Sequence, residues 1–202
     1  MAVMKLYVSL YRCDYAMCVA CETYSGVDGG FCGNDKAITE IYTLFLHDAF
    51  TIFDLHGMND RIDAGAPFKK TLELTAKDNP DWADELQIWH DRWIEMAAPL
   101  IPHSERLMYA LQAKGIPVFS LTNFGIQTYD LAAETYSFMR KFDRDFISGH
   151  MGVIKPTALI YQMLEDGSGL AGDELIFADD RTDNIAAADA RGWKTHLFEH
   201  PQ

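Results

Sequence analysis

The chain has 202 residues, of which 49% are hydrophobic and 23% are charged, as is usual for a globular protein. This length allows one hydrophobic core with a small inserted region, and the composition excludes a disordered, collagen-like or coiled-coil protein. The 17 basic and 30 acidic residues give a formal net charge of −13. We therefore expect no nucleic-acid partner and no anionic membrane surface as a partner, because both would need positive charge.

Neither a membrane-spanning segment nor a secretory signal is indicated. The best apolar candidate, residues 41–53, is interrupted by His47 and Asp48 and is shorter than the roughly 20 residues that a spanning helix needs. The apolar N-terminus meets Arg12 and Asp14 without a small-residue cleavage site. We expect a cytoplasmic protein that has no membrane partner.

The first third of the chain predicts one strand. Residues 5–11 (KLYVSLY) have the composition of a first strand, whereas residues 21–34 are rich in glycine and show no clear period. All four cysteines lie in this part of the chain: Cys13, Cys18, Cys21 and Cys32. Their spacing resembles that of a metal–thiolate site. The alternative is that residues 1–50 are foreign to the fold, through a fusion or a disrupted reading frame, and that the cysteines have no role.

Residues 66–114 predict helices. One helix face carries a repeating apolar series at spacings of three and four residues, which we interpret as core between packed helices: Trp82, Leu86, Trp89, Trp93 and Ala97. Ser104 is expected to cap the next helix, which ends at Gly115. Its inward side chains are expected to be Leu107, Met108 and Leu111.

Beyond Gly115 the chain alternates between strands and helices. Strands are expected at residues 116–121, 146–148, 174–178 and 194–198. Helices are expected at residues 128–136, from Pro156 in the first turn to a stop at Gly167, and at residues 183–190, closed by Gly192. This alternation is typical of an α/β fold in which helices cover both faces of a parallel sheet.

Two adjacent carboxylates, Asp179 and Asp180, follow the predicted strand at residues 174–178. Parallel sheets bind ligands beyond the carboxyl ends of their strands, and neighbouring carboxylates repel unless a cation or proton offsets their charge. Because hard cations prefer such oxygens, the pair indicates a Mg²⁺ site. The alternative is an acidic loop in which Asp183 caps the following helix and Asp180 is simply solvated.

Two further polar motifs belong to the same predicted edge. Thr122 and Asn123 directly follow a buried strand, where a hydroxyl and backbone N–H groups can hold a phosphate oxygen. The alternative is a turn in which both side chains satisfy their own backbone. Lys155 precedes Pro156, and a lysine fixed ahead of a helix can neutralise a nucleophile and a phosphoryl group, although a surface lysine is the alternative. A hydroxyl, a cation and a carboxylate pair at one edge favour the functional interpretation.

In this order the motifs resemble those of the haloacid dehalogenase-like (HAD) hydrolases, in the phosphatase-like branch that carries a helical cap. The similar segments are VFSLTN at residues 118–123, GVIKP at 152–156, FADD at 177–180 with Asn184 beyond it, and MNDRIDAG at 58–65, which is similar to the start of the cap. The resemblance implies a Rossmann-like core formed by residues 1–20 and 115–202. It implies a small helical cap inserted after the first strand, within residues 21–114.

The resemblance also implies a chemistry. An Asp that follows the first strand attacks phosphorus, and water then hydrolyses the phospho-aspartyl intermediate. Thr122 and the Asn123 amide would hold phosphoryl oxygens, and Lys155 would steady the nucleophile and the developing charge. Asp179 and Asp180 would hold the cofactor Mg²⁺ together with the nucleophile. The expected partner is a small phosphorylated substrate.

Three aspartates compete for the role of nucleophile, because none fits the first motif of the family cleanly. Asp14 follows the predicted first strand, Asp28 has Gly30 two places on, and Asp54 lies in a locally suitable segment. The resemblance implies a spacing of roughly a hundred residues between this aspartate and Thr122, so Asp54 is too close, particularly as residues 58–65 already resemble the start of the cap. We favour Asp14, as nucleophile and metal ligand, over Asp28, and a chain with no working nucleophile is the third alternative.

Three functions therefore remain open. The first is a Mg²⁺-dependent phosphatase, and the second is a 2-haloacid dehalogenase, in which the Asp attacks carbon without a metal. The carboxylate pair favours the phosphatase, because a metal-free site gains little from two adjacent carboxylates. The third is a catalytically inactive family member that binds a ligand or partner, as a degenerate first motif would produce. The substrate and the oligomeric state are not indicated.

Overall fold

The computed structural model describes residues 5–8, 54–97 and 101–199. In this part of the chain, strands that are all parallel form a single sheet in the order β3-β2-β1-β4-β5. Its strands are β1 (Lys5–Val8), β2 (Phe119–Thr122), β3 (Arg144–Ile147), β4 (Leu175–Asp179) and β5 (Lys194–Leu197). The predicted α/β fold class with a parallel sheet is confirmed.

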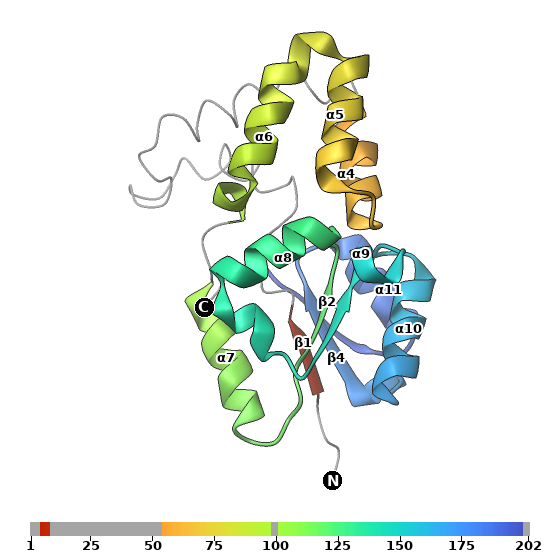
Figure 1. Cartoon of the computed structure of the whole chain (residues 1–202). Helices are drawn as coiled ribbons and strands as arrows, with labels where there is room; N and C mark the ends of the chain where they lie inside the picture. The colour runs from red at the N-terminus through yellow and green to blue at the C-terminus, as the bar shows by residue number, and fades with distance from the viewer. Residues whose placement is uncertain (1–4, 9–53, 98–100, 200–202) are drawn as a thin grey trace, which may run out of the picture.

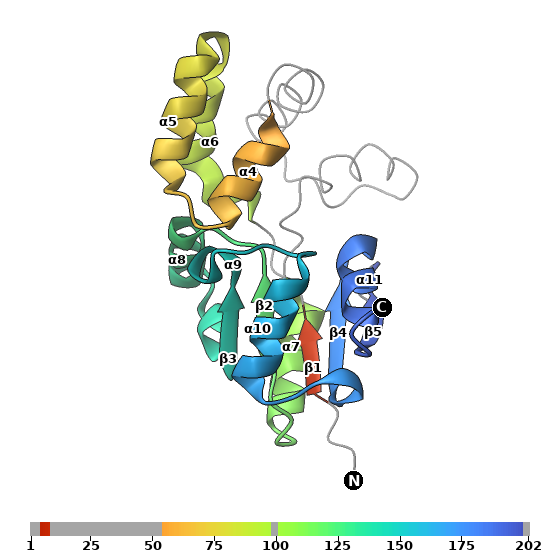
Figure 2. The same cartoon turned by 90° about the vertical axis from the view of Figure 1, so that its right-hand side faces the viewer.

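Helices surround this sheet on both faces and at one end. They are α4 (Leu55–Asp63), α5 (Phe68–Asp78), α6 (Ala83–Met96), α7 (Pro102–Gln112), α8 (Ile126–Thr135), α9 (Ser148–Met151), α10 (Ala158–Ser168) and α11 (Thr182–Asp189). Single turns of 3₁₀-helix lie at η1 (Pro80–Trp82), η2 (Ser137–Lys141) and η3 (Gly172–Glu174). Helices α7 and α8 lie on one side of the sheet and α10 and α11 on the other (Figure 1). Helices α4, α5 and α6, here called the cap helices, stand above the carboxyl ends of the strands (Figure 2).

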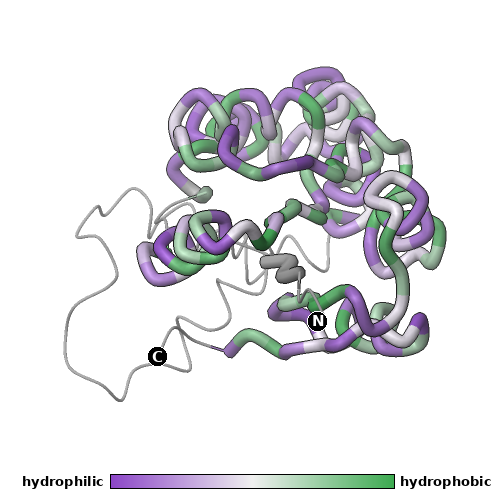
Figure 3. Tube along the Cα trace, turned by 90° about the horizontal axis from the view of Figure 1, so that it is seen from below, coloured by the Kyte–Doolittle hydropathy of each residue, from purple (hydrophilic) through white to green (hydrophobic). Residues whose placement is uncertain are grey.

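The buried side chains form two clusters. One cluster packs α10 and α11 against the sheet, with Ile160, Leu164 and Phe177 among its members. The other joins α7 and α8 to the cap helices, so that Met108 and Trp93 belong to the same apolar cluster. Hydrophilic and hydrophobic stretches alternate along the helices, as expected where one side covers a core (Figure 3). The cap helices therefore share a hydrophobic core with α7 and α8, the helices on one face of the sheet.

The apolar series of the helical region is confirmed as core. Leu86, Trp89, Trp93 and Ala97 are all less than a tenth exposed, and Trp82, in η1, is partly buried against them. These aromatic side chains pack between the cap helices and the loop after β2. Their burial supports the interpretation of this series as core.

Several predicted helix ends are wrong for identifiable reasons. Helix α7 begins at Pro102, so Ser104 is buried within the first turn instead of capping it. Leu107 is 39% exposed, whereas Met108 is buried as predicted. Helix α10 begins at Ala158, after Pro156, and runs past Gly167 to Ser168, because the left-handed backbone that ends it is at Gly169, with φ of +70°. Asp183 does not cap α11, since Arg181 occupies the N-cap position.

The division into core and cap remains a prediction. Residues 9–53 and 98–100, where its boundaries fall, lie outside the described part of the chain. Helix α7, which belongs to the predicted cap region at residues 21–114, lies beside the sheet (Figure 1). Within the described residues, none of the helices combines the length and apolar character needed to cross a membrane.

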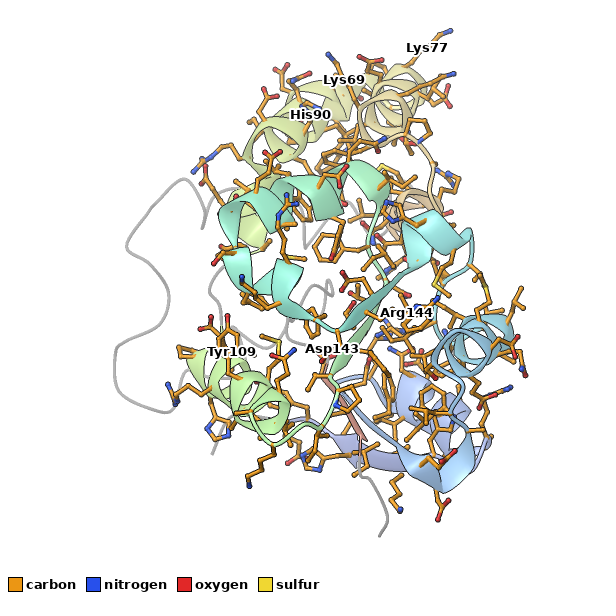
Figure 4. The ribbon with its side chains drawn as sticks, turned by 60° about the horizontal axis from the view of Figure 1, so that its bottom comes forward. Lys69, Lys77, His90, Tyr109, Asp143 and Arg144 are labelled. Atoms are coloured by element: carbon orange, nitrogen blue, oxygen red, sulfur yellow. The ribbon has the colours of Figure 1, made fainter. Side chains whose placement is uncertain are left out.

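Side-chain hydrogen bonds hold the outer elements on the sheet. Asp143, at the start of β3 (Figure 4), accepts hydrogen bonds from Val118 N at 2.8 Å and from Gln112 Nε2 at 3.0 Å, which joins β3 to α7. On the other face, Glu165 of α10 accepts from Trp193 Nε1 at 2.8 Å and from Arg191 Nε at 3.0 Å. Hydrogen bonds from Arg191 lower the pKa of Glu165, against the opposing effect of burial.

We predict that Glu165→Gln destabilises the protein at neutral pH more than at acid pH. The lowered pKa means that the stabilising contribution is present above the ordinary value of 4.5 and is lost as pH falls through the lower value of the folded state. At pH 7 the loss should be about 1 to 2 kcal/mol in the free energy of unfolding. Urea denaturation of both proteins between pH 7 and 3 measures it, and a difference that does not shrink on acidification would contradict the assignment.

Candidate functional site

Of the predicted site residues, those that the structure describes lie where the strands end beneath the cap helices. Thr122 is the last residue of β2 and Asp179 is the last residue of β4. Strand β1 lies between them, with Tyr7 opposite Phe119 and Val8 opposite Ala178. This edge of the sheet faces the cap helices (Figure 2). The topology therefore brings together the ends of strands that lie far apart in the sequence.

A buried ion pair forms the centre of the site. Lys155 Nζ lies 2.6 Å from Asp179 Oδ2, and the two side chains are only 5% and 1% exposed. The ammonium also lies 5.6 Å from the centre of the Phe177 ring, within the range of a cation–π contact. Burying either charge alone is costly, so each depends on the other. The alternative of an exposed surface lysine is excluded for Lys155.

The second oxygen of Asp179 is also occupied. Asp179 Oδ1 accepts hydrogen bonds from Arg181 N and from Asn184 Nδ2, each at 2.9 Å. With Lys155, three N–H donors surround this carboxylate. Asp179 therefore acts in this structure as the counter-ion of Lys155, and its predicted role as a metal ligand stays a prediction.

Asn123 holds the backbone of Lys155 through both ends of its side-chain amide. Its Oδ1 accepts from Lys155 N at 2.8 Å, and its Nδ2 donates to Lys155 O at 3.1 Å. We predicted a role for the Asn123 backbone amide and missed this role of the side chain. Asparagine commonly bonds to nearby backbone, but no short sequence pattern indicates a partner 32 residues away. The two bonds link the end of β2 to the turn before α10.

Asn184, which donates to Asp179, is itself held by a hydrogen bond from Tyr161. The Tyr161 hydroxyl donates to Asn184 O at 3.0 Å, and Asn184 is 2% exposed. Burial, with a smaller contribution from the charge of Asp179, raises the pKa of Tyr161, which keeps its hydroxyl protonated as a donor. We did not predict a role for Tyr161 from the sequence. Its apolar neighbours on α10 could have indicated a buried tyrosine, and a buried hydroxyl needs a hydrogen-bond partner.

The oxygen ligands at this edge fit a hard cation, although the described residues do not complete a site. Asp180 is half-buried directly after β4, and Asn184 Oδ1 is buried with no hydrogen-bond partner. Carboxylate and amide oxygens are ligands that Mg²⁺ accepts. Within residues 5–8, 54–97 and 101–199, no group of three or more His, Cys, Asp or Glu side chains could hold a metal.

The three candidate nucleophiles differ in what the structure says of them. Asp14 and Asp28 lie outside the described residues, as do the cysteines. Asp54 is exposed and caps α4, with Oδ1 accepting from Gly57 N at 2.8 Å. Asp54 thus begins the cap helices, in agreement with its exclusion as nucleophile on grounds of spacing.

We predict that Lys155→Met lowers the free energy of unfolding by about 3 to 5 kcal/mol, because it leaves the Asp179 charge buried without its cation. The double variant Lys155→Met/Asp179→Asn should lose less than the two single variants together, since it removes both charges. Chemical denaturation of the four proteins measures the coupling energy.

Lys194→Met is the matched control for this cycle. Lys194 donates to Asp173 O at 2.6 Å, but its side chain is 51% exposed, so its loss should cost less than about 1 kcal/mol. Equal losses for the Lys155 and Lys194 variants, or strict additivity in the cycle, would show that the buried pair contributes nothing special.

Comparison with known proteins agrees with this geometry. The family profile described as haloacid dehalogenase-like hydrolase matches residues 31–192. The matched part contains β2, the turn with Lys155 and the end of β4, together with the cap helices. It does not include Asp14 or Asp28.

Solved structures with the same fold include enzymes and predicted enzymes. A HAD family enzyme from Bacteroides thetaiotaomicron is 15% identical with a TM-score of 0.71, over 98% of this chain and 95% of that one. A predicted HAD-like family hydrolase from Porphyromonas gingivalis is 18% identical with a TM-score of 0.61, over 79% and 80%. The L-2-haloacid dehalogenase of Xanthobacter autotrophicus is 14% identical with a TM-score of 0.57, over 96% and 76%. These structures share a Rossmann-like core, which agrees with the observed fold. The profile match over residues 31–192 shows that the chain belongs to the haloacid dehalogenase-like hydrolase family.

Proposed function

We propose that this hydrolase is a Mg²⁺-dependent phosphatase that cleaves small phosphate monoesters. The observation that carries the proposal is the buried Lys155–Asp179 pair, set at the strand ends between Thr122 and the second carboxylate, Asp180. A buried ammonium at this edge provides positive charge where a phosphoryl group and an attacking carboxylate would meet. The combination of cation, hydroxyl and carboxylates is the chemistry that phosphoryl transfer needs.

Each residue of the site has a defined task in this proposal. An ammonium has three N–H donors, and Lys155 gives one of them to Asp179. The other two would contact the attacking carboxylate and a phosphoryl oxygen. The Thr122 hydroxyl and the Asn123 backbone N–H would hold further phosphoryl oxygens, while the Asn123 side chain keeps Lys155 in place.

We assign the nucleophile to Asp14, the first aspartate after β1. Strand β1 lies between β2 and β4, and Val8 pairs with Ala178, the residue before Asp179. A carboxylate that follows β1 in the sequence is therefore the natural candidate to meet a substrate held at the ends of β2 and β4. Asp28 remains the alternative.

The reaction is a double displacement at phosphorus. A carboxylate oxygen of Asp14 bonds to phosphorus as the ester oxygen leaves, and the departing alcohol takes a proton that solvent supplies. Water then attacks phosphorus and gives up a proton to solvent, and the bond between phosphorus and the Asp14 oxygen breaks, which releases inorganic phosphate and regenerates the carboxylate. Lys155 offsets negative charge in both steps.

Asp14, Asp179 and Asp180 would hold the Mg²⁺ cofactor, with Asp180 directly after β4 and Asp179 also serving as the counter-ion of Lys155. Bound Mg²⁺ would supply positive charge that orients and polarises the phosphoryl group. Structures of the Bacteroides enzyme with magnesium and inorganic phosphate are in keeping with this cofactor and product.

We predict that the protein releases phosphate from small phosphate monoesters with Mg²⁺ and not with chelator. Mg²⁺ at a hundredfold its Kd should also raise the free energy of unfolding by about 2.7 kcal/mol, and Asp180→Asn should remove most of that increase. A phosphate-release panel and thermal denaturation measure the two effects. Halide release from 2-haloacids without metal would favour the dehalogenase, and no release of either product would favour the inactive family member.

We predict that Asp14→Asn abolishes phosphate release, whereas Asp28→Asn retains most of it. The amide cannot attack phosphorus, although its shape is nearly that of the carboxylate. The two variants form a matched pair, because each replaces one carboxylate in the same part of the chain. Loss of activity in the Asp28 variant alone would transfer the role of nucleophile to Asp28.

A further inference from the structure

A buried serine links the cap helices to the loop after β2. Ser148, the first residue of α9, is fully buried. Its hydroxyl oxygen accepts a hydrogen bond from Phe124 N at 2.8 Å and donates to Asp63 O, at the end of α4, at 2.6 Å. The two partners lie 24 and 85 residues away in the sequence, so this one hydroxyl joins three separate segments.

The hydroxyl of Ser148 has two acceptors for a single hydrogen. Besides Asp63 O at 2.6 Å, Phe124 O lies 3.3 Å away. The shorter distance assigns the hydrogen to Asp63 O while the cap helices are in place. If the end of α4 moved away, the same hydrogen could turn to Phe124 O instead of being left unsatisfied in a buried position. The bond to the cap can therefore be broken without the full cost of an unpaired donor.

Glycines allow the three segments to meet at their backbones. A Cβ on Gly65, where φ is +103°, would lie 2.5 Å from Gly149 O. A Cβ on Gly125 would lie 2.7 Å from Ile62 Cγ2, and one on Gly149 would lie 2.7 Å from Phe124 O. A side chain at Gly65 or Gly125 would separate the end of α4 from α9 or from the loop after β2, and one at Gly149 would separate α9 from that loop. The absence of Cβ atoms therefore permits the contacts that Ser148 bridges.

The loop after β2 has a second connection to the cap. The Phe124 ring packs edge-on against Trp93 of α6, with ring centres 5.5 Å apart and planes at 69°. Phe68 N of α5 donates to Gln127 Oε1 at 3.1 Å, just beyond this loop. Phe124 thus contacts α6 through its side chain and reaches α4 through its backbone and Ser148.

Phe124 directly follows the residue that holds Lys155. Asn123 fixes the backbone of Lys155 by two hydrogen bonds. A displacement of Phe124 therefore shifts the neighbouring Asn123 and, through it, the turn that carries the ammonium. A continuous series of short contacts leads from Asp63 in the cap through Ser148, Phe124 and Asn123 to Lys155.

We propose that Ser148 is a positioning residue that couples the seating of the cap helices to the geometry of the loop that holds Lys155. When α4 is seated, the Ser148 hydroxyl is shared between cap and loop, and the loop is fixed in the arrangement that this structure shows. When α4 moves away, the Ser148 hydroxyl makes hydrogen bonds only to Phe124 in the loop. The kinetic consequence rests on the proposed function, whereas the coupling between the two segments does not.

The primary test compares Ser148→Ala with Thr128→Val. Thr128 is the matched control because its buried hydroxyl donates to Gly125 O at 3.0 Å, in the same loop, without a bond to the cap. Hydrogen exchange measured on peptides that cover residues 63–66 and 123–126 reports both sides of the junction. Ser148→Ala should accelerate exchange on both sides by about tenfold, as expected for the loss of one net hydrogen bond. Thr128→Val should leave residues 63–66 unchanged.

A reciprocal variant approaches the junction from the cap. Gly65→Ala introduces a Cβ against Gly149 O and leaves Ser148 and the loop residues intact. It should accelerate exchange at residues 123–126, in which it makes no substitution. The coupling would be overturned if Ser148→Ala accelerated exchange on only one side of the junction and Gly65→Ala did not accelerate exchange at residues 123–126. It would also be overturned if Thr128→Val accelerated exchange at residues 63–66.

The kinetic arm separates this inference from the proposed function. With p-nitrophenyl phosphate and Mg²⁺, Ser148→Ala should lower kcat by about tenfold or more with a smaller change in KM, because the loop is misplaced in the reacting complex. Thr128→Val should keep the wild-type kcat. If the wild-type protein releases no phosphate, the proposed function fails while the exchange experiment still decides the coupling. An unchanged kcat for Ser148→Ala in an active enzyme would show that the junction has no role in positioning.

Discussion

An ammonium and a carboxylate that are buried together constrain the rest of this structure. Lys155 and Asp179 are each tolerable in the interior only because the other is present, and their remaining polar groups must also find partners. Asn123 binds the backbone of the lysine, and Asn184 binds the carboxylate. These contacts require the ends of β2 and β4 and the start of α10 and α11 to meet at one point. The parallel sheet, with Tyr161 and its apolar neighbours beneath, is the scaffold that makes this meeting possible.

The cap helices are not an independent body placed over that site. Their buried side chains belong to the same apolar cluster as those of α7 and α8, and Trp93 packs directly on Phe124. Because part of this core lies between cap and sheet, movement of the cap would expose apolar surface to water, which opposes opening. The Ser148 hydroxyl favours opening, because its second acceptor, Phe124 O, can take its hydrogen bond when the bond to Asp63 O is broken. Packing therefore holds the cap in place, while the hydrogen bonding at the junction permits its release.

Local patterns in the sequence predicted the sheet more reliably than they predicted helix ends or long-range contacts. Apolar runs followed by polar residues located β2 and β4, and the rule that parallel strands expose their carboxyl ends at one edge brought Thr122, Lys155 and Asp179 to the same region. The end of α10 was misplaced because one glycine, Gly167, lies in its last turn and a second, Gly169, directly follows it, and only Gly169 has the left-handed backbone angle that ends the helix. The side-chain role of Asn123 and the junction at Ser148 depend on partners many residues away, which periodicity does not report. The nucleophile could not be assigned from contacts, because Asp14 and Asp28 lie outside the described residues.

The contact between the backbones of Gly65 and Gly149 has a consequence for how this enzyme can diversify. Where two parts of a protein meet through main-chain atoms, the contact depends little on which side chains the neighbouring helices carry. The faces of α5 and α6 that do not enter the core can therefore accumulate substitutions without disturbing the register between cap and sheet. Selection can therefore alter the outer faces of the cap helices while the contacts that fix Lys155 stay as they are. In such an arrangement the sequence of the cap and the geometry at the strand ends can change independently of each other.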